Sequence, residues 1–233
     1  MNKEMFINEL SKIGITLSYY QLNQLDKYYN MLIESNKNIN LTAITDYNQV
    51  LLKHFYDSLT ISKAIKLTNQ KVCDIGTGAG FPGIVLKIVY PNLEITLVES
   101  LTKRCIFLNE VIKELALKDI KVVNQRAEDF SKNNVEYFDI ITSRAVAKLN
   151  ILLELSIKSL KIGGYYIALK ANIDEEIKNI SNCLTKLNSS LNSITTFNLP
   201  IDNSIRNIIK IKKDGPTPPL YPRRYNEIKK RPL

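Results

Sequence analysis

The sequence predicts an α/β fold in which a mainly parallel, Rossmann-like sheet of seven strands follows an N-terminal helical cap. The first 65 or so residues show the apolar spacing of helices, whereas from Lys71 onward short apolar runs alternate with helical segments. Strands that alternate with helices form parallel sheets covered on both faces. A chain of 233 residues, 45% of them hydrophobic, can bury such a core without disulfide or metal staples.

The helical cap is predicted over residues 1–66. Apolar residues at helical spacing indicate a helix near residues 6–13. Ser18 and Gln21 have the spacing of a capping box, so a second helix is expected to begin there. After a polar break, Asp46 is placed to cap a third helix, which contains the only histidine of the chain.

The sheet is predicted within residues 67–213. Its strands are the apolar runs Lys71–Ile75, Glu94–Val98, Ile120–Val123, Phe138–Thr142, Tyr165–Leu169, Ile194–Leu199 and Arg206–Ile211, the last two as an antiparallel pair. Helices are expected over Ile84–Tyr90, around 106–115, and over Ile151–Leu160 with Gly163 and Gly164 closing it.

Net charge points to a polyanionic partner. The chain carries 32 basic and 23 acidic side chains, and residues 210–233 alone account for +6 of the net +9. Five of the eight prolines also lie there, so residues 214–233 are predicted to be an extended basic tail. Without an amphipathic helix or an acylation signal, RNA phosphates are a better partner for Arg223 and Arg224 than a membrane.

Cysteine usage predicts a reduced, cytoplasmic chain that holds no metal. The three cysteines are isolated, no CxxC is present, and a single histidine leaves too few ligands for a structural zinc site. Buried packing is the expected role of Cys73, Cys105 and Cys183. The first residues lack the apolar core of a signal peptide, and no apolar run approaches the ~20 residues of a membrane span.

A glycine-rich turn after the first predicted strand marks a ligand site. Residues 74–83 contain four of the eight glycines, at the strand end where the order of a doubly wound sheet reverses. Residues 78–83 fit the dinucleotide pattern GxGxxG. However, the carboxylate of Asp74 lies beside the turn, where its negative charge would disfavour a pyrophosphate. Asp74 for an ammonium group and Glu99 for ribose hydroxyls favour S-adenosylmethionine, with a nicotinamide cofactor as the alternative. Cofactor contacts are also expected from Gly76, Thr77, Gly78 and Ser100.

The chain lacks the residues that two classes of methyl acceptor would require. The segment 142–146, after the fourth strand, lacks the Asn/Asp-Pro-Pro-aromatic motif of enzymes that methylate exocyclic base amines. No cysteine is on a strand-end loop, as pyrimidine C5 methylation would require. An acceptor such as guanine N7 needs alignment but no general base. Arg144, at the end of the fourth strand, is the candidate catalytic residue; it could hold the base, a phosphate or the cofactor carboxylate, or form only a salt bridge with a surface acid.

Six strings, in order along nearly the whole chain, resemble the RsmG (GidB) family of bacterial 16S rRNA guanine-N7 methyltransferases. They are Asn40-Leu41-Thr42, His54–Ser58, Cys73–Gly83, Leu101–Arg104, Ser143-Arg144-Ala145 and Tyr221–Arg224. The resemblance implies the fold of S-adenosylmethionine-dependent methyltransferases, S-adenosylhomocysteine as product, and a guanine in the decoding-region loop of 16S rRNA, naked or in the small ribosomal subunit, as target. It implies cofactor contacts at Gly76, Phe81, Ala127, Glu128 and Arg144.

Several further residues are expected to face RNA. The resemblance implies that Asn40, His54 and Asp57 shape an RNA entrance, whereas a core histidine is the default interpretation of His54 from its apolar neighbours. Lys103, Arg104 and Arg126 cluster at one rim of the expected cleft. The alternatives to a monomeric methyltransferase are an RNA-binding assembly factor with a vestigial cofactor pocket and, more remotely, a nicotinamide-dependent oxidoreductase.

Overall fold

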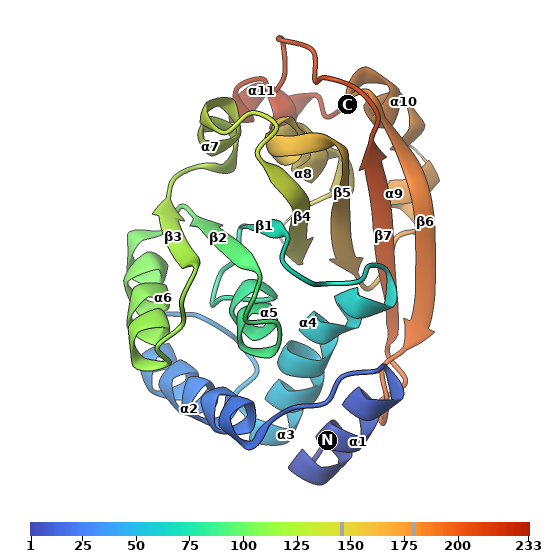
Figure 1. The fold of residues 1–233 in the computed structure, drawn as a ribbon. Coiled ribbons are helices and arrows are strands. Elements are labelled where there is room, and N and C mark those ends of the chain that lie inside the picture. Colours follow the sequence, from blue (N-terminus) through green and yellow to red (C-terminus); the bar gives the residue numbers. More distant parts are fainter. Residues whose placement is uncertain (145–146, 179) are drawn as a thin grey trace.

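A computed structural model of the chain describes residues 1–144, 147–178 and 180–233. Its centre is a seven-stranded sheet in the order β3-β2-β1-β4-β5-β7-β6 (Figure 1). The strands are β1 (Lys71–Ile75), β2 (Glu94–Glu99), β3 (Ile120–Asn124), β4 (Phe138–Arg144), β5 (Leu160–Lys170), β6 (Ser189–Asn198) and β7 (Ile205–Lys213). The strand order reverses beside β1, which confirms the predicted α/β class and the place of the switch point.

Five strands run parallel, and the last two form the expected antiparallel pair. β1 pairs in parallel with β2 on one side and β4 on the other, whereas β7 pairs antiparallel with both β5 and β6. Parallel pairing places the ends of β1, β2 and β4 at the same edge of the sheet, and the predicted ligand residues follow those ends.

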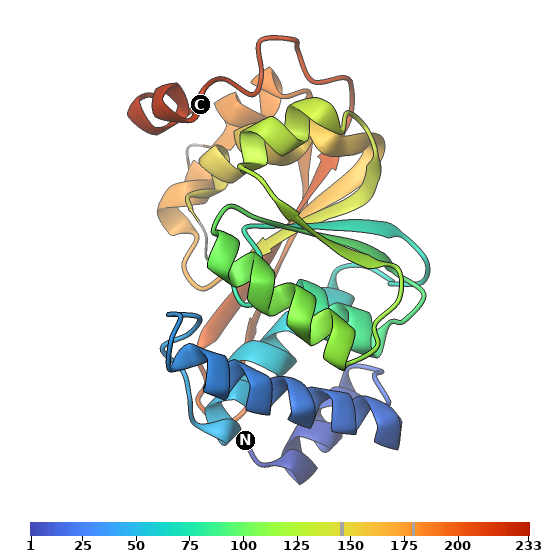
Figure 2. The ribbon, with the colours of Figure 1, turned by 90° about the vertical axis from the view of Figure 1, so that its left-hand side faces the viewer.

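Each face of the sheet packs against its own group of helices. Alternate residues of β1 point to opposite faces, so Val72 joins one apolar cluster while Cys73 and Ile75 join the other. The first cluster includes residues of α5 (Gly83–Val89), α6 (Thr102–Glu114) and the N-terminal helices; the second includes residues of α7 (Ala127–Asn133), α8 (Leu149–Ser156) and α10 (Ile180–Lys186). Figure 2 shows the sheet between these two groups of helices.

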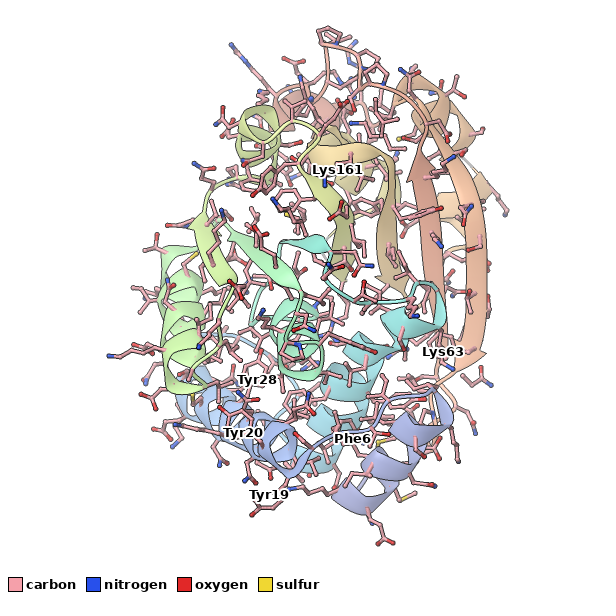
Figure 3. The ribbon with its side chains drawn as sticks, viewed as in Figure 1. Phe6, Tyr19, Tyr20, Tyr28, Lys63 and Lys161 are labelled. Carbon is pink, nitrogen blue, oxygen red and sulfur yellow. The ribbon has the colours of Figure 1, made fainter. Side chains whose placement is uncertain are left out.

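The N-terminal helices lie against the first face, below the sheet in Figure 1. They are α1 (Lys3–Lys12), α2 (Tyr19–Asn36), α3 (Tyr47–Val50), the π-helical segment η1 (Leu51–Tyr56), α4 (Asp57–Leu59) and the 3-10 segment η2 (Thr60–Lys63). Ser18 and Gln21 form the predicted capping box, and the Asp46 side chain accepts from Gln49 N as the predicted cap. Figure 3 labels Phe6 and Tyr28, both buried at this junction, whereas Tyr19 and Tyr20 are exposed at the outer edge.

The helix expected over Ile151–Leu160 was placed too late, and its predicted end was wrong. α8 gives way to a short 3-10 segment, and β5 already begins at Leu160, so Gly163 and Gly164 lie within a strand. A Cβ at Gly164 would lie 2.8 Å from the carbonyl oxygen of Asp139 on β4, and the β4–β5 register shifts there. The glycine pair permits close approach of two strands and does not cap a helix.

The tail is not extended throughout, because α11 (Tyr225–Lys230) forms within it. The helix lies between Pro222 and Pro232, in a stretch without proline. The prolines therefore exclude a helix only in the residues before α11. Two further helices, α7 and α9 (Asp174–Lys178), were not predicted. Among the residues that the structure describes, no helix is long and apolar enough to cross a membrane.

Candidate functional site

Asp74 lies at the centre of the glycine turn, fully buried near the end of β1. Its Oδ2 accepts hydrogen bonds from Thr77 Oγ1 at 2.6 Å and from Gly83 N at 2.9 Å. Its Oδ1 is buried and has no hydrogen-bond partner among the residues that the structure describes. Burial raises the pKa of Asp74 to about 6, although the bonds from Thr77 and Gly83 and the charge of Arg144 act in the opposite direction. One carboxylate oxygen therefore has unused capacity to accept a hydrogen bond.

Glycine is required in this turn by packing as well as by backbone conformation. Gly80 has a φ of +105°, and a Cβ there would lie 2.7 Å from the hydroxyl oxygen of Tyr28, which donates to Ala79 O. A Cβ at Gly83 would clash with the Leu97 side chain. The turn is thus pressed between α2 of the cap and β2 of the sheet.

Glu99, at the end of β2, lies beside the same turn. Its two oxygens accept from Gly78 N at 3.1 Å and from Leu101 N at 2.9 Å. The Arg104 guanidinium lies 3.6 Å from Glu99 and also donates to the main-chain oxygen of Asn40 in the cap. The two carboxylates singled out in the sequence therefore flank one glycine turn, and Arg104 connects one of them to the cap.

A cavity of about 300 Å³ opens next to Glu99. Of the predicted cofactor residues, Gly76, Glu99, Ser100, Ala127 and Glu128 line it, together with Arg104 and Arg126 from the predicted RNA-facing group. Leu152 and Leu155 of α8 form part of its wall, and the sequence did not point to them. Its size and its mixed polar and apolar lining suit a small ligand. A second cavity of about 470 Å³, between α2 and the end of α5, contains no predicted site residue.

Phe81 and Arg144 lie in a separate cluster, at the junction with the cap. The Phe81 ring stacks on His54, with centroids 4.5 Å apart, and the Arg144 guanidinium lies 4.9 Å from the centre of the same ring. Arg144 Nη1 donates to Lys53 O at 2.9 Å, and Nη2 lies 3.1 Å from His54 Nδ1. The π-helical segment η1 supplies both of these partners, so it holds the arginine in place.

A chain of ion pairs connects this cluster to strand β7. Asp57, which is buried, is paired with Arg144 at 3.3 Å and with Arg206 of β7 at 2.9 Å. Burial lowers the pKa of Arg144, and the charge of Asp57 opposes that effect. The salt bridge weighed for Arg144 thus exists, but its acid is buried and belongs to the cap. No sequence signal singled out Arg206.

His54 is a buried, hydrogen-bonded histidine, as the default interpretation predicted. His54 Nδ1 lies 3.1 Å from both Arg144 Nη2 and Lys53 O, and Nε2 lies 2.7 Å from Thr42 Oγ1. Because an arginine can only donate, Nδ1 accepts from Arg144 in the tautomer whose proton is on Nε2. Burial, followed by the charge of Arg144, lowers the pKa of His54 to about 3. The imidazole is neutral near pH 7 and both of its nitrogens are engaged. The RNA-facing roles of His54 and Asn40 stay predictions.

The remaining cations of the predicted RNA surface differ in their surroundings. Lys103, Arg126 and Arg224 are exposed. Arg223, in contrast, forms a two-pronged ion pair with Glu154, a fully buried residue of α8, at 2.6 Å for each prong. Of the two tail arginines predicted to bind RNA, Arg224 is therefore the one whose side chain faces solvent.

The three cysteines are free and buried in β1, α6 and α10, as expected. Burial raises the pKa of each thiol, that of Cys183 to about 12, so none is an activated nucleophile. Within the described ranges, no group of three or more histidine, cysteine, aspartate or glutamate side chains could hold a metal ion. Of the segment 142–146 and the string Ser143-Arg144-Ala145, residues 145 and 146 lie outside the described residues.

Solved structures show which proteins share this fold. A S-adenosylmethionine-dependent methyltransferase from Aquifex aeolicus superposes with a TM-score of 0.54 at 15% identity, covering 72% of this chain and 94% of the other. TYW2 of M. jannaschii, solved in complex with AdoMet, gives a TM-score of 0.54 at 16% identity, over 67% of this chain and 76% of the other. The fold is that of Rossmann-like, S-adenosylmethionine-dependent methyltransferases.

Sequence relatives identify the family. Residues 21–207 match the GidB family, described as rRNA small subunit methyltransferase G. Proteins named ribosomal RNA small subunit methyltransferase G are 44% identical in Bacillus cytotoxicus, over 100% of this chain and 99% of the relative, and 43% identical in Thermoanaerobacter sp. strain X514, over 99% and 98%. The chain belongs to this family, which confirms the resemblance seen in the sequence.

Proposed function

We propose that the chain transfers a methyl group from S-adenosylmethionine to N7 of a guanine in the decoding-region loop of 16S rRNA, in the cytoplasm. The observation that carries the proposal is the glycine turn between two carboxylates: Glu99 and Gly76 line a cavity of about 300 Å³. On the other side of the turn, the buried Asp74 keeps one oxygen without a partner among the described residues. The rRNA substrate is supported by the names of the full-length relatives and by the net charge of +9.

The residues present fit this cofactor. Asp74 Oδ1 can accept from the ammonium group, because Oδ2 alone is already hydrogen-bonded. Glu99, which lines the cavity, would accept from the ribose hydroxyls, and Ala127 and Glu128 of the same lining would contact the adenine edge. When bound, the cofactor supplies an activated methyl group.

The surroundings of Arg144 favour an acceptor that needs no protein base. His54, the only histidine, has both nitrogens engaged, and the pKa of about 3 keeps it neutral. Guanine N7 carries a lone pair and no proton, so methyl transfer by direct in-line displacement requires alignment and a suitable electrostatic environment. Arg144, only 12% exposed and next to Asp57, is the fixed cation at this strand end.

A transfer assay tests the proposal. The chain is incubated with cofactor tritiated in its methyl group and with either small ribosomal subunits or naked 16S rRNA from cells that lack this protein. We expect label in the RNA and, by mass spectrometry, 7-methylguanine in one loop of the decoding region. Tight binding of the subunits without any transfer would instead support the assembly-factor alternative. Label in another base or in a ribosomal protein would contradict the N7 assignment.

The exposed cations of the tail are expected to contribute to RNA affinity. Replacement of Arg224, Lys229 and Lys230 by alanine removes three charges without touching the Arg223–Glu154 pair. If each cation makes one phosphate contact, the slope of log K against log salt should become shallower by about 2, at ~0.7 per contact for single strands. Filter binding between 50 and 300 mM salt measures the slope, and an unchanged slope would exclude the tail from the RNA interface.

A further inference from the structure

The tail residue Arg223 neutralises a charge buried beneath the cofactor cavity. Glu154 is fully buried in α8 and accepts from Arg223 Nε and Nη2, each at 2.6 Å, and from the Arg223 main-chain nitrogen at 3.3 Å. The guanidinium itself is 17% exposed, so the tail forms the outer cover of this pair. A two-pronged bond between a guanidinium and a carboxylate fixes orientation as well as distance.

The helix that holds Glu154 also forms a wall of the cavity. Leu152 and Leu155 of α8 line the same cavity as Ala127 and Glu128. The structure therefore places an ion pair on one side of a short helix and a cavity surface on the other. A shift of α8 of a few tenths of an ångström would change the width of the cavity.

A second contact joins the tail to the opposite wall. The ring of Tyr225, at the start of α11, lies 5.7 Å from the guanidinium of Arg126, and Arg126 precedes the cavity residue Ala127. α11 packs against α8, as Figure 1 shows at the top of the molecule. Asn150 Nδ2 of α8 also donates to the main-chain oxygen of Leu233. The tail thus contacts both sides of the cavity from outside.

We propose that Glu154 and Arg223 are positioning residues for the cofactor, and that the C-terminal segment is a structural part of the cofactor site. This inference rests on the proposed function, since it assigns the cavity to the adenosine portion of the cofactor. Loss of the Arg223 side chain removes the charge partner of Glu154 and leaves it only the main-chain nitrogen of residue 223, at 3.3 Å. A buried carboxylate without a charge partner is strongly destabilising unless it moves toward solvent. Movement of Glu154 displaces α8, and with it Leu152 and Leu155.

Calorimetric titration with S-adenosylhomocysteine and with adenosine tests the inference, at a temperature where circular dichroism shows each variant folded. Arg223→Ala is expected to lower the affinity for both ligands about tenfold, because both contain the adenosine portion that the proposal assigns to the cavity beside α8. Arg223→Lys, which keeps the charge but not the two-pronged geometry, is expected to recover part of the affinity. Lys230→Ala removes a cation from the same tail helix and is expected to leave both affinities unchanged.

A double variant covers the case in which Arg223→Ala does not fold. Glu154→Gln combined with Arg223→Ala contains no unpaired buried charge, and it is still expected to bind about tenfold more weakly, because neither side chain then fixes α8. Unaltered affinity in a folded variant without Arg223 overturns the inference alone. Failure of the unaltered chain to bind S-adenosylhomocysteine overturns the proposed function, and the inference with it.

Discussion

Replacement of Arg144 by alanine is expected to lower the rate of methyl transfer at least a hundredfold while the chain stays folded. Removing one fixed charge or hydrogen-bond donor from a reaction site costs on the order of 10²–10³ in rate. The fold should survive because Asp57 keeps its second partner, Arg206, at 2.9 Å. Single-turnover transfer of tritium to small subunits measures the rate, and thermal unfolding measures stability.

Two further variants make the Arg144 result specific. Arg144→Lys keeps a charge, but an ammonium group cannot reproduce the two contacts that the guanidinium makes with Lys53 O and His54 Nδ1. This variant should therefore recover little activity. Lys161→Ala removes a cation from the opposite end of the sheet, where Lys161 pairs with Asp139, and should transfer at the unaltered rate. Normal turnover by Arg144→Ala would remove this residue from the mechanism.

Affinity for S-adenosylmethionine is expected to fall about tenfold for each pH unit below about 6, because a protonated Asp74 cannot pair with an ammonium group. The pKa of Asp74 is raised from its ordinary value of 3.8 to about 6. Without ligand, the folded chain holds this proton more tightly than the unfolded chain. Asp74 therefore favours folding below pH 3.8, and that contribution is lost as the pH rises through about 6. A bound ammonium group should lower the pKa again.

Asp74→Asn is the matched test of this pH dependence. Asparagine keeps the shape and can still accept one hydrogen bond, but it carries no charge at any pH. Calorimetry from pH 5 to 8 should show affinity about a hundredfold weaker at pH 7.5, roughly 2.7 kcal/mol, with no dependence on pH. Asp139→Asn, at the opposite end of the sheet, should keep the normal profile. A pH-dependent Asp74→Asn variant would mean that another group titrates.

Periodicity predicted the sheet well because its signals are local. Five strands alternate with helices and the ligand turn follows β1, so strand number, the antiparallel final pair and the switch point could all be predicted. The boundary between α8 and β5 could not. Gly163 and Gly164 look like a helix end in isolation, and only the close approach of β4 explains them. α11 was missed because the prolines around it dominated the interpretation of the tail.

The same distinction between local signals and long-range contacts applies to the candidate site. The sequence could predict that Asp74 and Glu99 lie close together, because they lie near the ends of strands that pair side by side in the sheet. The partners of Arg144 depend on contacts between residues about 90 positions apart, and Arg206 reaches Asp57 across 149 positions. Spacing along the chain contains no record of such contacts. For Arg223 the sequence predicted a cation at the surface, but it could not reveal a buried acid beneath it.

The contact between Gly80 and Tyr28 has a consequence for how such chains diverge. A larger residue at position 80 would collide with the phenol of Tyr28, and a smaller one at position 28 would leave an empty space in the interior. A Cβ at position 80 would also lie 2.6 Å from the Ile84 side chain, so a smaller residue at position 28 would not by itself make room for it. In a chimaera that takes its N-terminal helices from one homologue and its sheet from another, both parents must therefore supply the tyrosine and the glycine of this contact.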